Sequence, residues 1–417
     1  MTSRREATDP VTRLLAPADA RASWDLGAES FGYPGPVPDP LPDPTRDEQI
    51  AVGSFVGDRL VARAVALADR SWWGGREVAT AGIASVAIAL EQRGEGLLAP
   101  LLADLLDRAR HRGDALATLY PTAQGIYRSS GFETVTSFDQ VELDTRDLLA
   151  ARADRADRAD RAARGADASP VTLRRGTGAD HDAVHRVYTA WARRHDGPLT
   201  RSGPRFPADA EAFLQALDGV QTTVAEQDGE VTGYALWQRA DGYHRGVTAV
   251  DDLLATTPEA YLSLLHHLGS SYAVAPRTTL WTSGDDVIRV LLPSNAWRRV
   301  DCRPYKLAVL DVPAALAARG WAPHVDAELR FAVTGPAPVA GCYRLRVEAG
   351  RATCEPDASG RADGIRVMSP RSLALTYAGA RSSASQRAVG LLDGPTTNDA
   401  TWDALTGGRA VQVRDYF

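Results

Sequence analysis

The sequence predicts three consecutive domains, two of the α/β class and a final one of the α+β class. The first observation is length, because 417 residues exceed the roughly 100–200 residues that one domain usually contains. The second is an order of strands and helices in residues 1–150 that recurs in residues 170–293. The third is a change of pattern in residues 294–417, where strands come first and helices follow.

The composition limits the classes of function. The net charge of −6 is mildly acidic, whereas a general binder of phosphate backbones carries a basic surface, so no nucleic-acid partner is expected. The chain has three cysteines, Cys302, Cys342 and Cys354, with no CxxC pair and no Cys/His cluster. An odd number without a framework spacing predicts reduced thiols, and we expect no metal site.

Hydropathy and the cysteines together predict a cytoplasmic protein. No stretch approaches the ~20 apolar residues that a membrane span requires. The start, Met1–Glu6, is charged and lacks the apolar core of a secretory signal.

The first domain begins, after the proline-rich loop Tyr33–Pro44, with a hairpin around the turn Gly57-Asp58. An apolar run rich in β-branched residues follows, and leucines then recur at helical spacing up to a capping glycine, Gly113. The elements expected in residues 1–150 are strands Ile50–Gly57, Arg59–Ala68 and Glu77–Leu90, helix Gly96–His111, strand Ala115–Tyr120, short helix Ala123–Ser130 and strand Phe132–Leu143.

The remaining chain divides into a linker and two domains. Residues 151–169 are predicted to form a charged linker, since Arg152–Arg161 repeats Arg-Ala-Asp and its charges cancel. The second domain is expected to hold strands Val171–Leu173, Gln221–Glu226, Glu230–Gln238, Val247–Asp252 and Thr278–Thr282 with helices Asp180–Arg194 and Pro258–Leu268. The third is expected to hold strands Glu328–Val333, Cys342–Val347 and Gly364–Val367, helices Ser369–Ala378 and Asn398–Leu405, and the alternating end Ala410–Phe417.

A glycine turn carries the clearest chemistry. Arg93-Gly94-Glu95-Gly96 joins the buried strand ending near Leu90 directly to the leucine-rich helix. Such a turn presents unpaired backbone N–H groups at the positive end of the helix dipole, which together form an anion site suited to a pyrophosphate. The glycines allow a ligand to approach the backbone closely, and Arg93 adds a positive charge.

Gly94, Gly96 and Ala99 also fit the dinucleotide pattern GxGxxG/A. That alternative requires an acidic residue at the end of the next strand, about 20 residues further on. Asp114 lies at about that distance but precedes the strand, which itself ends in Leu119-Tyr120-Pro121. The dinucleotide interpretation is therefore the weaker one.

The turn resembles the pyrophosphate loop of the GNAT acetyltransferase superfamily, R/Q-x-x-G-x-G/A, although its last position is Leu98. The resemblance implies that acetyl-CoA is the co-substrate. It implies that the backbone of Val86 and Ile88 pairs with the pantetheine arm. It further implies that the phosphates are held by the amides of Arg93, Gly94, Glu95, Gly96, Leu97 and Leu98.

A second segment, Tyr127-Arg-Ser-Ser-Gly131-Phe132, matches the Tyr-x-x-x-Gly-Phe segment that follows the next strand in GNAT enzymes. By that resemblance Tyr127 protonates the leaving thiolate, which suits a phenol of similar basicity. The alternative is an aromatic side chain that only packs on a short helix.

The whole layout resembles the Eis family (enhanced intracellular survival), with a catalytic GNAT domain, a degenerate one and a sterol carrier protein-like domain. The second domain lacks the glycine turn and reads Asp251-Asp-Leu-Leu-Ala-Thr-Thr-Pro258 instead. Segments that carry the resemblance are Gly125–Tyr127 with Gly131, Val312–Gly320 and Leu375–Ala380. The resemblance implies a homo-hexamer and a C-terminal carboxylate, here that of Phe417, acting as general base. An ordinary terminal strand is the alternative for Phe417.

The expected activity is acetyl transfer from acetyl-CoA to a primary amine, with aminoglycosides and other polyamines as candidate substrates by resemblance. Tyr416 stands where acidic residues occur in that family, so the amine itself is left open. The competing hypothesis is a non-catalytic carrier that binds an apolar ligand through residues 294–417.

Overall fold

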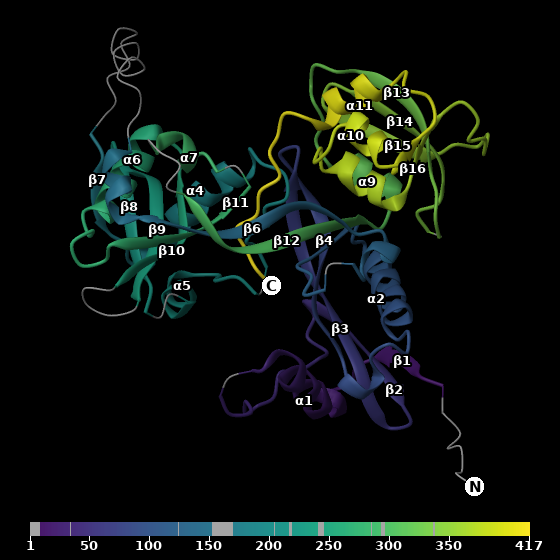
Figure 1. The fold of residues 1–417 in the computed structure, drawn as a ribbon, viewed down its shortest axis with the longest axis horizontal. Helices are drawn as coiled ribbons and strands as arrows, with labels where there is room; N and C mark the ends of the chain where they lie inside the picture. The colour runs from purple at the N-terminus through teal and green to yellow at the C-terminus, as the bar shows by residue number, and fades with distance from the viewer. Residues whose placement is uncertain are drawn as a thin grey trace.

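The computed structural model describes residues 9–33, 35–123, 125–151, 170–203, 205–216, 219–240, 246–284, 286–292, 297–336 and 338–417. The repetitive part of the expected linker, Arg152–Arg161, lies outside these ranges. The described chain forms three lobes around one long sheet (Figure 1).

The first lobe begins with β1 (Val11–Leu14), α1 (Ala20–Phe31), β2 (Gln49–Val56), β3 (Arg59–Trp73), β4 (Arg76–Ile88), α2 (Leu98–Arg112), β5 (Leu116–Leu119) and β6 (Glu133–Asp144). The second lobe contains β7 (Thr172–Arg175), α4 (His181–Ala192), α5 (Ala210–Ala216), β8 (Gln221–Gln227), β9 (Glu230–Ala240), β10 (Val247–Ala255), α6 (Pro258–Gly269), β11 (Arg277–Ser283), α7 (Ile288–Leu291) and β12 (Arg298–Val309). The short helix expected at Ala123–Ser130 is wrong, because only the 3-10 turn η3 (Arg128–Ser130) forms there.

The two α/β lobes exchange their last strands. The twelve strands of the large sheet run in the order β1-β2-β3-β4-β5-β12-β6-β11-β10-β9-β8-β7. β12, from the end of the second lobe, pairs antiparallel with β5, and β6, from the end of the first lobe, pairs antiparallel with β11. β6 and β12 also pair with each other at the centre. The sheet therefore continues from one lobe into the other, and β12 belongs to this sheet although it follows the expected boundary at residue 294.

Helix α2 is fixed on the first lobe by its leucines. Leu101, Leu102 and Leu105 are fully buried against β2, β3 and β4 residues such as Ala64 and Ile83. Each buried leucine stabilises the fold by about 2 kcal/mol. Gly113 ends the helix with φ 103°, in the left-handed region that favours glycine. This packing holds the start of α2 beside the end of β4.

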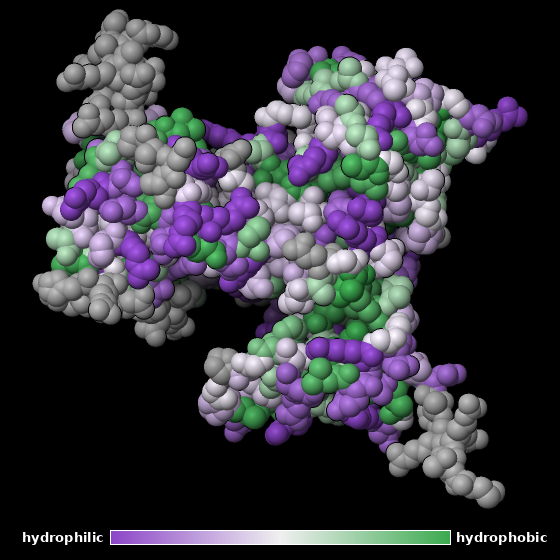
Figure 2. All heavy atoms as spheres, in the orientation of Figure 1, coloured by the Kyte–Doolittle hydropathy of each residue, from purple (hydrophilic) through white to green (hydrophobic). Residues whose placement is uncertain are grey.

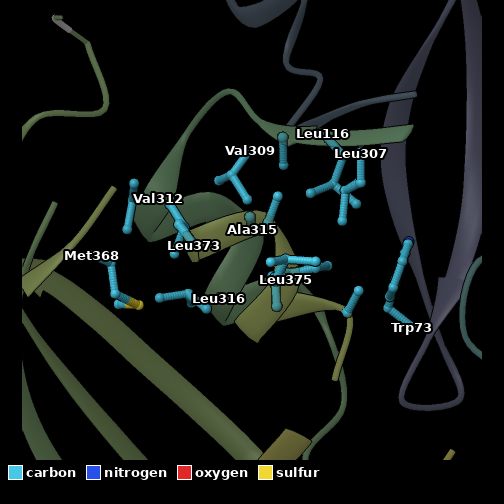
Figure 3. Close-up of a cluster of buried hydrophobic side chains, with 14 of the residues drawn as sticks. Trp73, Leu116, Leu307, Val309, Val312, Ala315, Leu316, Met368, Leu373 and Leu375 are labelled. Carbon is cyan, nitrogen blue, oxygen red and sulfur yellow. The ribbon is translucent and has the colours of Figure 1, made fainter. Parts of the chain in front are cut away.

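The third lobe contains α8 (Val312–Ala318), β13 (Ala327–Val333), β14 (Gly341–Glu348), β15 (Arg351–Pro356), β16 (Arg366–Met368), α9 (Pro370–Tyr377), α10 (Ser383–Ala388), β17 (Leu392–Asp393) and α11 (Asp399–Thr406). Its five-stranded sheet has the order β15-β14-β13-β16-β17. Its core joins that of the first lobe, since Leu316 and Leu375 lie in one cluster with Trp73 and Leu116 (Figure 3). The interior is filled by Phe331 and Trp402, whose rings meet edge to face.

The three lobes meet at the tip of the β3–β4 hairpin. The N–H of Gly74 donates to Asp196 of the second lobe at 2.6 Å, and the N–H of Gly320 donates to the Trp73 carbonyl at 3.0 Å. A Cβ at Gly320 would lie 2.1 Å from the Gly74 carbonyl oxygen. The two backbone segments can therefore approach this closely only because residue 320 has no side chain. Arg319, which is fully buried, also forms an ion pair with Asp196.

Gly320→Ala is therefore expected to destabilise the protein by about 3 kcal/mol, because backbone must move away from backbone. Thermal denaturation should show a melting midpoint lower by roughly 5 °C or more. Gly125→Ala is the matched control, since a Cβ at Gly125 meets nothing within 4 Å. Equal midpoints for the two variants would contradict the close contact.

Candidate active site

The candidate site lies where two parallel strands of the first lobe separate. β4 and β5 pair only through Thr80–Gly82 and Leu116–Thr118. Beyond Gly82 the strand β4 continues to Ile88, whereas β5 ends at Leu119. Within the described ranges, no strand pairs with the edge of β4 that faces β5 beyond this point. Such an open edge can bind an extended ligand through backbone hydrogen bonds, as an added strand would.

A bulge lies in this open part of β4. Arg63 of β3 pairs with Ala87, but Val65 pairs with Ala84, so β4 has one more residue than β3 here. Ser85 has a φ of 53°, and such bulges bend a strand and redirect its groups. Val86 lies in the bulge and Ile88 two residues later, and both are partly buried on the cluster that holds α2.

The glycine turn follows β4, and its amides divide into two groups. Two of them bond within the turn, because Arg93 N–H donates to the Leu90 carbonyl at 3.3 Å and Glu95 N–H to the Gln92 carbonyl at 3.4 Å. In the described chain we find no acceptor for the N–H groups of Gly94, Gly96, Leu97 and Leu98. No side chain caps the first turn of α2 either. The turn thus keeps free donors at a helix N-terminus, the arrangement that binds phosphate.

Backbone conformation explains the glycines of this turn. Gly94 and Gly96 have φ values of 89° and 77°, which L side chains rarely adopt. A Cβ at either position would meet nothing within 4 Å, so space is not the reason. The Arg93 side chain is exposed and its Nε donates to the Ile88 carbonyl at 3.4 Å. It therefore lies at the junction of the open strand edge and the turn.

The corresponding turn of the second lobe has no glycines, and its helix start is capped. Pro258 at the start of α6 has no N–H. The Thr257 hydroxyl caps the helix by accepting from the Ala260 N–H at 3.3 Å. The second domain thus differs from the first in a physical way: its helix start carries a side-chain cap and a proline in place of the uncapped glycine turn.

Tyr127 packs against the same buried cluster as residues of β4 and β5. Its ring belongs to the buried cluster that contains Ile83 of β4 and Leu119 of β5, and it is 4 % exposed. Phe132 packs edge to face against it, with ring centroids 6.1 Å apart. Burial raises the pKa of the Tyr127 phenol above its usual value of 10, so the group stays protonated at neutral pH.

The C-terminal segment crosses from the third lobe to this opening (Figure 1). The expected terminal strand is wrong: residues 410–417 form a single parallel bridge, between Asp196 and Val411, and otherwise run as irregular chain. Side chains hold the segment instead. Arg414 is buried and pairs with Asp286, while the Asp415 carboxylate accepts from Arg201 Nε at 2.8 Å.

Phe417 reaches the point where β4 and β5 separate. Its ring lies 3.1 Å from the position of a Cβ on Gly82, so a side chain on Gly82 would displace it. The Tyr120 ring lies 5.4 Å from it, and the Arg205 guanidinium lies over its face at 5.2 Å. The structure therefore brings Phe417 beside Gly82, the last residue of β4 that pairs with β5.

Three polar residues at this opening were not foreseen from the sequence. The buried carboxylate of Asp69 on β3 accepts two hydrogen bonds from Arg205, at 2.8 and 2.9 Å. Burial raises the pKa of Asp69, and the Arg205 charge opposes that rise. The Tyr120 hydroxyl donates to the Asp415 backbone carbonyl at 2.6 Å. Of these only Tyr120 had a sequence signal, its position at the end of a predicted strand.

A groove runs along α2 on the side that faces the third lobe. It has a volume of about 480 Å³ and is lined by Ala99, Ala103 and Leu106 of α2, the segment Ser129–Gly131, and prolines of the third lobe. Apolar side chains gather on the surface over α2, below the third lobe (Figure 2). The groove begins at the first turn of α2, beside the free amides.

Two general features complete the description. Among the described residues, no group of three or more His, Cys, Asp or Glu side chains is placed to hold a metal ion. The helices in the same ranges are all too short or too polar to cross a membrane.

Comparison with known families divides the chain into three parts. Residues 12–135 match one acetyltransferase (GNAT) domain model, residues 184–310 match a second, and residues 312–412 match a sterol carrier protein domain model. The second match includes β12, in agreement with its place in the large sheet.

Relatives and solved structures agree with these matches. The chain is 28 % identical to the N-acetyltransferase Eis of Mycobacterium tuberculosis over 66 % of each chain. It is 29 % identical to an uncharacterized N-acetyltransferase of Streptomyces coelicolor, over 76 % of this chain and 75 % of that one. A GCN5-related N-acetyltransferase structure from Kribbella flavida has a TM-score of 0.81 at 26 % identity, covering 98 % of both chains.

The Eis1 structure from Mycobacterium abscessus has the same fold, with a TM-score of 0.74 at 20 % identity, covering 98 % of this chain and all of that one. The expected pair of GNAT domains and the sterol carrier protein-like third domain are confirmed. The chain is an enzyme of the GNAT superfamily and belongs to its Eis-like N-acetyltransferases.

Proposed function

We propose that this enzyme transfers an acetyl group from acetyl-CoA to a primary amine, with the coenzyme bound on the first lobe and the C-terminal segment completing the site. The observation that carries the proposal is the set of free amides at Gly94, Gly96, Leu97 and Leu98, beside the open edge of β4. A ligand with a pyrophosphate and an extended amide-bearing arm matches both features at once.

In this proposal the pantetheine arm lies along β4 at Val86 and Ile88, where backbone groups are free of β5. The pyrophosphate lies on the turn from Arg93 to Leu98. Because the amides of Arg93 and Glu95 bond within the turn, we assign the direct contacts to the other four. The groove along α2 begins at this turn and is a suitable place for the nucleotide end.

The reaction is direct attack of the amine nitrogen on the thioester carbonyl. The carbon–nitrogen bond forms, the carbon–sulfur bond breaks, and the departing sulfur takes the proton of the Tyr127 phenol. The proton lost by the amine goes to the terminal carboxylate of Phe417, directly or through water. A free α-carboxylate has a pKa of about 3.5, so it is ionised at neutral pH and able to accept a proton.

The acceptor is proposed as a primary amine, with aminoglycosides and polyamines as candidates. The carboxylates of Asp69 and Asp415 near the opening support a cationic substrate, although both are already paired with arginines. By family resemblance we further propose a homo-hexamer as the active assembly. The carrier hypothesis stays the alternative, and the core of the third lobe contains the buried rings of Phe331 and Trp402.

Gly96→Ala tests the coenzyme site. A methyl group at φ 77° strains the turn and redirects the amides that follow it. We expect the KM for acetyl-CoA to rise about tenfold, the effect of losing one charge-assisted hydrogen bond, with kcat changed little. The measurement is steady-state acetylation of a panel of amines at varied acetyl-CoA concentration.

Gly113→Ala is the matched control for this variant. Gly113 lies at the other end of the same helix, has a φ of 103°, and would place its Cβ in open space. An alanine at position 113 therefore strains the backbone to a similar extent but leaves the glycine turn unchanged. If both variants change the KM for acetyl-CoA equally, the turn is not the phosphate site.

A further inference from the structure

The second lobe contains a cavity of about 280 Å³ that the catalytic proposal does not use. It lies between α4, α5, the segment from Arg201 to Pro207, and strands β9 and β10. Its apolar wall consists of Val184, Tyr188, Phe206, Phe213 and Leu236. The volume suits one aromatic ring with a short side arm.

A β-bulge brings two consecutive carboxylates into this cavity. Val250 of β10 pairs with Trp237, and Asp252 pairs with the adjacent Leu236, so Asp251 is the extra residue. Neighbouring residues of a regular strand point to opposite faces, whereas a bulge can turn both toward one side. Asp251 and Asp252 both line the cavity. The bulge stands in the strand that corresponds to β4, which bulges at Ser85.

One carboxylate oxygen in the cavity has no partner. Asp252 is 3 % exposed, and its Oδ2 accepts from the Tyr234 hydroxyl at 2.7 Å and from Arg201 Nη1 at 3.0 Å. No hydrogen bond reaches its buried Oδ1 from the described residues. An unmet acceptor of this kind costs about 1–3 kcal/mol, so a donor supplied by a ligand would be stabilised there. Such a donor would leave both bonds to Oδ2 intact.

The charges around the cavity favour a cation. The charged groups at and behind its wall include the carboxylates of Asp251, Asp252, Asp286 and Asp415 and the guanidiniums of Arg201 and Arg414, and Asp182 lies 2.9 Å from Nδ1 of the lining residue His181. Arg201 is shared by Asp252 and Asp415, and Arg414 is paired with Asp286. His181 and His185 also line the cavity. His181 donates from Nε2 to the Pro207 carbonyl at 3.1 Å. Among the described residues no arginine or lysine pairs with Asp251, and burial together with the Asp252 charge raises its pKa.

The cavity is separate from the catalytic opening. Arg205 contacts Asp69 and Phe417 at the catalytic opening. The next two residues, Phe206 and Pro207, line the cavity instead. The second lobe lacks the uncapped glycine turn proposed to hold the coenzyme, since Thr257 caps the start of α6 and Pro258 has no N–H there. A ligand in this cavity is therefore bound and not acetylated there.

We propose that this cavity is a non-catalytic binding site for a protonated primary amine carried on a small aromatic body. The ammonium group lies between Asp251 and the Oδ1 of Asp252, and the ring lies between Tyr188, Phe206 and Phe213. The proposal goes beyond acetyl transfer and does not depend on it.

Crystals of the full chain soaked with para-bromophenethylamine test the proposal, because the anomalous signal of bromine locates the ring. The expected result is bromine between Tyr188, Phe206 and Phe213, whether or not a second site appears beside Tyr127. Bromine found only beside Tyr127, or in no ordered position, would overturn the proposal.

Calorimetry of the same amine supplies the affinity test. Asp251→Asn is expected to weaken the binding located in the cavity at least about tenfold, since a charge-assisted contact is lost. Glu230→Gln, which changes an exposed acid of the same lobe, should leave the Kd unchanged. The uncharged analogue para-bromophenethyl alcohol should bind at least about tenfold more weakly. Equal binding of alcohol and amine, or an unchanged Kd for Asp251→Asn, would contradict recognition of the ammonium group.

Discussion

Tyr127→Phe is expected to lower kcat about 100-fold, the contribution of a positioned general acid, while the Kd for acetyl-CoA changes little. The substitution removes only the hydroxyl, and the ring keeps its place in the cluster with Ile83, Leu119 and Phe132. Because burial raises the pKa of this phenol above 10, the wild-type donor should persist through the whole neutral range. Single-turnover acetylation and calorimetry measure the two quantities separately.

Tyr377→Phe is the matched control for Tyr127→Phe. Tyr377 is also buried, and its hydroxyl has no partner within the described chain, but it lies in the third lobe. Its removal should leave kcat unaffected. A Tyr127→Phe enzyme that turns over at the wild-type rate would exclude Tyr127 from proton transfer.

A two-glycine extension after Phe417 is expected to lower kcat about 100-fold or more, because it converts the proposed base into a neutral amide. The side chains that fix the segment would remain, since Arg414, Asp415 and their partners are unchanged. The protein should therefore keep its melting midpoint and its affinity for acetyl-CoA. Steady-state kinetics on the best amine of the panel provide the measurement.

Two further proteins separate the carboxylate from the ring. Phe417→Ala keeps the carboxylate but loses the contacts with Tyr120 and Gly82, so we expect a smaller loss that appears mainly in the KM for the amine. The same two glycines added at the N-terminus control for the extension itself. Wild-type turnover with the C-terminal extension would rule out the Phe417 carboxylate as the base.

Local patterns predicted the first lobe well because its elements are determined by short-range sequence. The leucines of α2, the glycines at positions 94, 96 and 113, and the apolar run of β4 each specify a conformation from their own neighbours. The fold class rests on these signals and the two GNAT domains rest on the family resemblance, and both are confirmed. The site residues Val86, Ile88, Arg93 to Leu98, Tyr127 and Phe417 stay predictions that await the experiments above.

Long-range pairing set the limit of the sequence-based predictions. β12 was not predicted as a strand, and nothing in Arg298–Val309 indicates that it inserts between β5 and β6. The partnership of Arg205 with Asp69 joins residues far apart in the chain, from different lobes. The alternation of Ala410–Phe417 indicated a strand. Instead, the side chains of Arg414 and Asp415 form ion pairs that hold the segment across two lobes. The short helix at Ala123–Ser130 failed because Gly131, with φ 85°, closes a single tight turn instead.

The central claim is that the first lobe binds acetyl-CoA on the glycine turn and that the second lobe does not. Calorimetric titration of the full chain with acetyl-CoA tests it most directly. We predict one site per chain, with a Kd between about 1 µM and 1 mM, weakened by Gly96→Ala and unaffected by Gly113→Ala. Two sites per chain, or no heat of binding at millimolar acetyl-CoA, would contradict the claim.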